Sequence, residues 1–239
     1  MVKKTGVGVL LSLVFVLFTY SSAVAESYVG FGLGVSLPHD TTDIKGTTAA
    51  GVTGTGTDVS PQDEFAYGFK VGHYLDAMPW LGVEFNFGQS DPDVEKQTAT
   101  ATGTAGVLGT AVGQVQVDVN SATTLGFLVM LRANEEQTKN LLNFQPFLGL
   151  GFGVNILDLG DATTFTTAGA FNSGTNLGSD TSIGILLSAG LNYEVSENVK
   201  AYGEYKYTEA SYDVKGADSV DYEFDAGGSS LIFGLSYGF

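Results

Sequence analysis

Cysteine is absent from this chain of 239 residues, so disulfide scaffolds, thiol nucleophiles and zinc–thiolate sites are excluded together. Histidine is nearly absent: His39 and His73 occur without a G-x-S-x-G, H-x-S or H-E-x-x-H motif. Ser36, His39 and Asp40 have the residue types of a catalytic triad, but a polar loop flanked by Pro38 explains them equally well. We therefore expect neither an enzyme nor a bound cofactor.

Positive charge is scarce as well. The chain carries 10 Lys and Arg against 26 Asp and Glu. Removing Lys3 and Lys4 with an N-terminal leader leaves 8 basic against 26 acidic residues, a net charge of about −18. Such a charge argues against nucleic acids and other polyanions as partners. Positive and neutral partners remain open.

Long apolar runs are limited to residues 7–18, which follow Lys3 and Lys4 and precede a small-residue site at residues 23–25. This order is that of a secretory signal peptide. A membrane anchor is the alternative, but a spanning helix needs about 20 apolar residues. The sequence therefore predicts a signal peptide at residues 1–25 and one domain at residues 26–239. If that domain crosses a membrane, it must do so as a closed β-barrel.

The C-terminal segment, in contrast, is rich in alternating apolar residues. One face of an extended strand would carry Leu231, Phe233, Leu235, Tyr237 and Phe239. The other face would carry small or aliphatic residues. A half-buried edge strand of a soluble sheet shows the same alternation, so this segment alone decides nothing.

Eight segments of this kind occur after residue 25. They lie at residues 29–35, 65–71, 81–87, 125–131, 148–154, 183–193, 199–207 and 231–239. Their lengths approach the roughly 9 to 11 residues of a tilted membrane-spanning strand. The connections alternate long and short, and short turns belong to the periplasmic side of such barrels. We therefore predict an all-β fold, an eight-stranded antiparallel up-and-down transmembrane β-barrel.

Two segments carry a family resemblance. Residues 144–153 resemble the P-[YF]-x-G-x-G-x-G strand of small OmpA-like outer-membrane barrels, and residues 189–207 are similar to the G-x-x-Y, turn, E-Y-x-Y hairpin of that group. The resemblance implies a location in the outer membrane of a Gram-negative cell, with lipid and lipopolysaccharide as partners. It also implies that Tyr237 and Phe239 form a C-terminal signature read by the barrel-assembly machinery. We expect no peptidoglycan-binding domain after the last strand.

Charged residues are predicted to face the barrel lumen. They are Lys70, Glu84, Arg132, Glu194, Lys200, Glu204 and Lys206. Glu194 and Lys200 lie opposite each other across a turn, and Lys70 lies diagonally from Glu84. Because an unpaired buried charge is costly, we interpret these residues as a charge-paired plug. A conduction or gating ladder is the alternative.

Apolar residues on the same inward face leave a further possibility. Leu128, Met130, Leu186 and Ile232 are predicted to point into the lumen, and they would suit an apolar cavity.

The long connections are predicted to be surface loops. The first two contain Gly-, Thr- and Ala-rich stretches at residues 46–57 and 98–110, for which we expect little burial. The fourth reads as a hairpin that rises above the membrane, with a phase-correcting bulge at Gly227 and Gly228. Asp221, Glu223 and Asp225 would share one face there. A divalent cation and a solvated acidic face are both compatible with them.

The function that these observations favour is structural. We expect a plugged barrel that anchors four surface loops and acts by surface contact, in adhesion or envelope integrity, with an unidentified extracellular partner. A narrow porin and a carrier of a small apolar solute are the alternatives.

Overall fold

The computed structural model describes residues 26–48, 53–56, 59–103, 111–133, 143–166, 171–215 and 220–239. The predicted signal peptide lies outside these ranges. Among the described residues, no helix is long and apolar enough to cross a membrane.

The described chain consists of β-strands joined by turns. The strands are β1 (Ser27–Pro38), β2 (Thr42–Thr48), β3 (Thr53–Gly56), β4 (Glu64–Leu75), β5 (Met78–Ser90), β6 (Val94–Gly103), β7 (Ala111–Arg132), β8 (Phe144–Thr166), β9 (Phe171–Glu194), β10 (Val199–Lys215) and β11 (Val220–Gly238). Each of the eight predicted segments lies within one strand to within one residue. The all-β antiparallel class is confirmed, but the described residues form eleven strands rather than the eight predicted.

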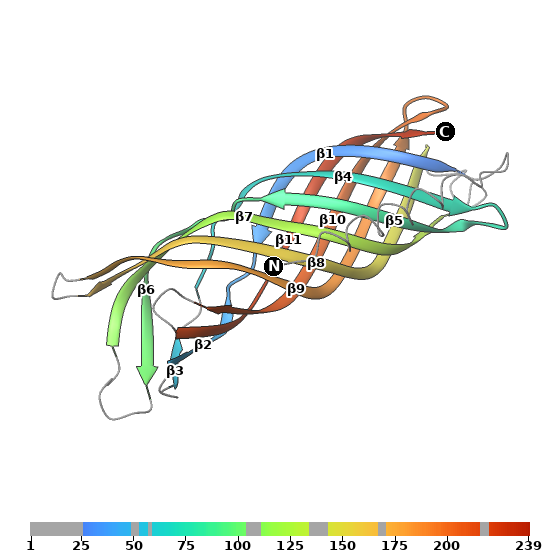
Figure 1. Ribbon diagram of the computed structural model, residues 1–239. Helices are drawn as coiled ribbons and strands as arrows, with labels where there is room; N and C mark the ends of the chain where they lie inside the picture. Colours follow the sequence, from blue (N-terminus) through green and yellow to red (C-terminus); the bar gives the residue numbers. More distant parts are fainter. Residues whose placement is uncertain are drawn as a thin grey trace.

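Eight of the strands pair in a circuit. β1 pairs with β4 on one side and with β11 on the other, and the pairings lead from β4 through β5, β7, β8, β9 and β10 to β11 (Figure 1). We call this circuit the ring. Its turn end holds Phe239 and the turns after β4 and β9, and its hairpin end holds the hairpin between β10 and β11.

Three short strands extend the ring at the hairpin end. β2 pairs with β11 and β3, and β6 pairs with β3 and β7. They replace β1, β4 and β5 between β11 and β7 (Figure 1). The described parts of the first two predicted loops therefore contain strands. In β6, Thr98, Thr100 and Thr102 alternate, and this β-branched residue favours strands even in a low-complexity segment.

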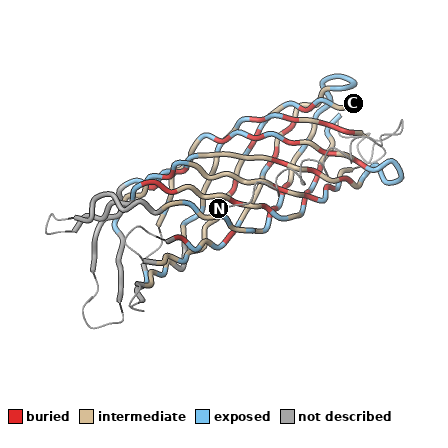
Figure 2. The backbone as a smooth tube through the Cα atoms, viewed as in Figure 1, coloured by how far each residue is buried: buried red, intermediate tan, exposed pale blue. Residues whose placement is uncertain are grey.

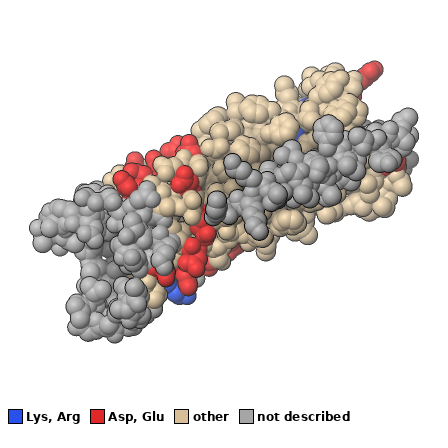
Figure 3. Space-filling model, viewed as in Figure 1, with Lys and Arg blue, Asp and Glu red and all other residues tan. Residues whose placement is uncertain are grey.

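The outer surface of the ring carries a broad apolar band. Exposed residues alternate with less exposed ones along the strands of the ring (Figure 2). The exposed side chains include Phe31, Phe69, Leu150, Ile183 and Phe233. In the view of Figure 3 this band is almost free of charge, and Asp and Glu gather beside it toward the hairpin end. A surface so apolar is unsuited to water and matches the hydrocarbon layer of a membrane.

The bulge predicted at Gly227 and Gly228 is absent from the β10–β11 ladder. Thr208 pairs with Gly228 and Glu209 with Gly227, and the register runs without a shift to Lys215 and Asp221. Even-numbered residues of β11 therefore face the interior from Tyr222 to Ser236. The apolar residues change phase because the environment changes, while the strand keeps its register. The two arms of the predicted hairpin do pair, with Tyr212 opposite Phe224 and Val214 opposite Tyr222.

Candidate functional site in the lumen

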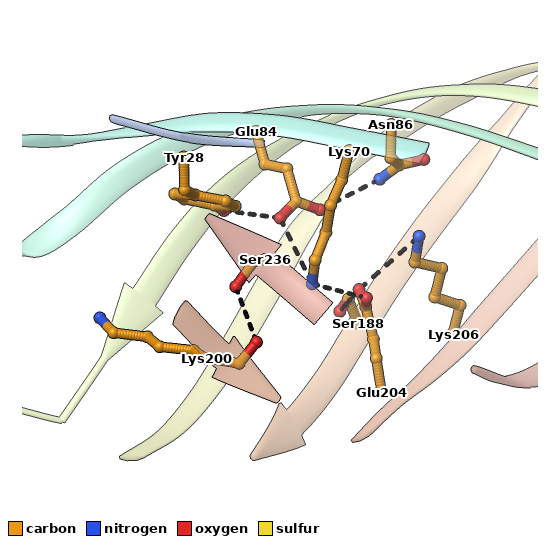
Figure 4. Close-up of polar contacts among 9 residues, drawn as sticks. All are labelled: Tyr28, Lys70, Glu84, Asn86, Ser188, Lys200, Glu204, Lys206 and Ser236. Carbon is orange, nitrogen blue, oxygen red and sulfur yellow. Dashed lines mark hydrogen bonds and ion pairs between the residues drawn. The ribbon is translucent and has the colours of Figure 1, made fainter. Parts of the chain in front are cut away.

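A buried ion cluster occupies the middle of the ring. Lys70 from β4 lies between Glu204 from β10 and Glu84 from β5, with its Nζ at 2.9 Å from Glu204 Oε2 and 3.9 Å from Glu84 Oε2 (Figure 4). The three side chains are at most 4% exposed. Strands from opposite parts of the sequence thus meet at one cation.

Neutral side chains complete this cluster. Tyr28 donates a hydrogen bond of 2.6 Å to Glu84, and Ser188 donates one of 2.6 Å to Glu204 (Figure 4). Asn86 donates a longer bond of 3.5 Å to Glu84. Lys70 Nζ also lies 3.6 Å from the centre of the Tyr202 ring. Among the described residues, every buried side-chain nitrogen or oxygen has a partner, so no polar group of the cluster is left without a hydrogen bond.

A second ion cluster closes the turn end. Glu26, which precedes β1, accepts hydrogen bonds from Arg132 and Lys200. The Arg132 guanidinium also stacks over the Tyr74 ring at 3.7 Å from its centre. Burial raises the pKa of the Glu26 carboxyl, but Arg132 and Lys200 outweigh it and hold the pKa below its usual value of 4.5.

The structure corrects one predicted ion pair. Glu194 and Lys200 do pair across β9 and β10, as expected from the turn. The Lys200 ammonium, however, lies at Glu26, and the Glu194 side chain is exposed. Sequence reasoning missed Glu26 because the contact spans the ring and follows from no local spacing. Tyr74 faces inward at the same end, where it stacks on Tyr28 with ring centres 5.8 Å apart.

Apolar side chains fill the space around the ions. Leu128, Met130 and Phe147 pack with Tyr28 and Tyr74 in one buried cluster. Inward glycines make room for them: a Cβ added at Gly149 would lie 2.8 Å from Met130 Sδ. The cavity that remains between the two ion clusters has a volume of only about 20 Å³. It is close to the size of a single water.

A much larger cavity lies on the other side of the central cluster, toward the hairpin end. Its volume is about 450 Å³. Leu186 and Ile232 line it, and Leu186 also packs in the buried cluster that contains Leu128 and Met130. We call this cavity the hairpin-end chamber.

The remaining predicted residues do not assemble into catalytic or metal sites. His39 Nε2 lies 3.1 Å from Ser229 Oγ on β11, so the serine that its ring contacts is Ser229 and not the neighbouring Ser36. Among the described residues, no three His, Asp or Glu are grouped to hold a metal, and this includes Asp221, Glu223 and Asp225. Tyr237 and Phe239 are exposed on the outer face at the turn end.

Comparisons with solved structures show the fold. The chain is similar to the outer-membrane protease OmpT of Escherichia coli, with 10% identity, coverage of 92% of this chain and 100% of that one, and a TM-score of 0.53. OprG of Pseudomonas aeruginosa matches with 15% identity, 90% and 96% coverage and a TM-score of 0.48. Neisserial surface protein A matches with 15% identity, 89% and 97% coverage and a TM-score of 0.45.

The family is shown by a sequence model. No curated protein gives a significant match to this chain. The model of the outer membrane protein beta-barrel domain matches residues 10–239, which is nearly the whole chain. The protein therefore resides in the outer membrane, and it belongs to the outer membrane protein beta-barrel domain family.

Proposed function

We propose that the ring is a closed membrane-spanning barrel with a plugged lumen, which acts as a structural and surface-contact protein. The observation that carries this proposal is the buried cluster of Lys70, Glu84 and Glu204, which crosses the lumen and in which each charged side chain has a hydrogen-bond partner. Eight-stranded barrels have an interior just wide enough for side chains to fill. A lumen filled in this way anchors the strands and leaves no continuous water path.

The orientation follows from the two ends. Short turns favour a periplasmic turn end, and Trp80, Phe144 and Tyr193 are exposed there as an interfacial aromatic belt would be. The hairpin end then faces the outside. The Asp and Glu residues that gather beside the apolar band toward this end form an acidic rim (Figure 3). This rim meets the lipopolysaccharide layer, and the hairpins offer the surface for an extracellular partner.

Conductance in planar bilayers tests the plug. We expect wild-type protein to give little or only rare conductance, because the remaining cavity between the ion clusters holds about 20 Å³. A variant with Phe147→Ala and Tyr202→Ala removes two rings that pack on Lys70, and should conduct more often. Retention of heat-dependent migration in SDS gels shows that both proteins are folded. Steady, large wild-type currents would overturn the plug and support a narrow porin instead.

A catalytic role has less support. The likeness to OmpT stands at 10% identity and concerns the fold alone. The inward ionisable groups at the centre of the ring bond to one another, and such pairing is typical of structural charges. We therefore propose that the protein is not an enzyme.

Assembly is the role that we propose for the C-terminal residues. Tyr237 and Phe239 lie on the outer face at the turn end, accessible to the barrel-assembly machinery during insertion. Deleting Phe239 should reduce the membrane-inserted fraction strongly, whereas removing residues 213–223 from the hairpin should leave insertion intact. Cell fractionation with quantitative immunoblotting measures both. Equal losses from the two changes would contradict this role.

A further inference from the structure

The hairpin-end chamber is a candidate binding site that the plugged-barrel function does not use. Its volume of about 450 Å³ falls within the roughly 300–1,000 Å³ typical of small-molecule pockets. It begins where the central ion cluster ends, at Leu186 and Ile232, and continues between the strands of the hairpin end. A structural barrel needs no such space, because its interior can be filled by its own side chains, as the turn end is.

The wall of the chamber is largely apolar. Val119 and Leu159 are less than a tenth exposed and belong to one buried cluster, against which Tyr212 and Phe224 pack with ring centres 5.6 Å apart. These residues lie at the hairpin end, where the outer surface carries the acidic rim. Apolar side chains that line a cavity favour an apolar occupant, because removing apolar surface from water is favourable.

The charges around the chamber are strongly biased. The chain has 26 Asp and Glu, yet none is among the described residues that line this cavity. Lys206 is the single lysine or arginine in that lining. His39 also lines it, and its ring bonds to Ser229. The described lining therefore favours a ligand with one anionic group, placed at Lys206.

The Lys206 ammonium has hydrogen-bond donors available for an anionic group of a ligand. Its Nζ lies 3.7 Å from Glu204 Oε1, a distance too long for a good hydrogen bond (Figure 4). Glu204 meanwhile accepts shorter bonds from Lys70 at 2.9 Å and Ser188 at 2.6 Å. The plug therefore does not consume the three donors of the Lys206 ammonium. Asn155 and Thr208 line the chamber near the same level and add hydrogen-bonding groups.

We propose that the hairpin-end chamber binds a small amphiphile with one linear apolar chain and a single carboxylate, whose headgroup pairs with Lys206. The chain of the ligand lies against Val119, Leu159 and Phe224. An amphiphile with a cationic head is disfavoured, because Lys206 would repel it and the described lining offers no carboxylate.

Photolabelling in lipid nanodiscs tests this site. The probe is a decanoate with a diazirine at the end of its chain, and the labelled residues are read by mass spectrometry. We expect labelling that saturates, that unlabelled decanoate competes away, and that maps to inward positions of β8, β10 and β11. Decanol should compete more weakly, and decyltrimethylammonium should not compete.

Two variants separate the headgroup from the cavity. Lys206→Met should weaken competition by decanoate at least about tenfold and leave competition by decanol unchanged, while Lys206→Arg should retain decanoate binding. Ala210→Phe fills the chamber from β10 and should abolish saturable labelling. The matched control is Ile185→Phe, whose side chain is exposed on the outer face, and it should label as the wild type does.

Folding of each variant is checked by heat-dependent migration in SDS gels. If Ala210→Phe fails to fold, Ala226→Phe on the facing position of β11 fills the same space. Labelling that does not saturate, or that is equal in the filled variant and the wild type, would overturn the site. The proposed preference for a carboxylate headgroup would be contradicted if Lys206→Met left competition by decanoate unchanged and decanol competed as well as decanoate. Neither result depends on conductance, so the photolabelling experiment tests the chamber independently of the plugged lumen.

Discussion

The same two strands, β10 and β11, behave in opposite ways at the two ends of the molecule. In the membrane band their apolar residues, such as Tyr205 and Phe233, point outward, and the charged Glu204 points inward. At the hairpin end Val214 is buried inside, and Asp213 is exposed outside. The register between the strands is continuous through both regions. The inversion of the pattern therefore marks where the surroundings change from lipid to water.

The two regions are stabilised by different interactions. In the band, lipid solvates the outer face, so the interior is free to hold ions, provided that they are paired. At the hairpin end water solvates the outer face, so only the interior is available for apolar burial. Substitutions of the same kind should consequently change stability by different amounts in the two regions.

Loss of a lysine should give the largest difference in stability between the two regions. Lys70→Met leaves Glu84 and Glu204 in the lumen without their shared cation, and should cost about 3–5 kcal/mol of unfolding free energy. Lys45→Met, at an exposed site on β2, is the matched control and should change stability by less than about 0.5 kcal/mol. Urea unfolding in lipid vesicles measures both. Equal destabilisation would mean that the central cluster adds nothing beyond an ordinary surface charge.

Addition of an arginine to the outer face should show the next largest difference. Leu150→Arg places a charge in the lipid-facing band and should cost about 2–4 kcal/mol if the site lies near the midplane. Ser211→Arg, at an exposed position of β10 beyond the band, should be nearly neutral. The inserted fraction and the urea midpoint of each variant report the effect. If Ser211→Arg also lowered stability strongly, the lipid-facing band would have to reach the hairpin end.

Much of the ring could be predicted from the sequence, because its strands face two different environments. Alternation identified the eight segments that form it, and the turn at residues 196–198 fixed the register between Glu194 and Lys200. The hairpin end was predicted less well. The phase change near Gly227 was interpreted as a bulge, although the register is constant and only the solvent changes.

The ion pairs could be predicted only in part. The inward face of Lys70 and Glu84 follows from alternation, but Glu204 reaches Lys70 from the other side of the ring. Glu26 precedes the first strand and has no periodic pattern to reveal it, yet it joins Arg132 and Lys200. Contacts across a ring depend on its closure and on side-chain length, and neither is encoded in local spacing.

The smallest effect should come from the turn-end cluster, because water reaches it. Glu26→Gln removes the carboxylate that Arg132 and Lys200 share, and should cost about 1 kcal/mol near neutral pH. The pKa of Glu26 is lowered in the folded protein, so its contribution exists above its usual pKa of 4.5 and disappears as the pH falls through the lower folded value. Wild type and variant should therefore differ in urea midpoint at neutral pH and converge in acid. Glu194→Gln, at an exposed position nearby, serves as the control and should change little at either pH. A difference that persists unchanged in strong acid would show that Glu26 acts by packing, since a protonated carboxyl no longer attracts the two cations.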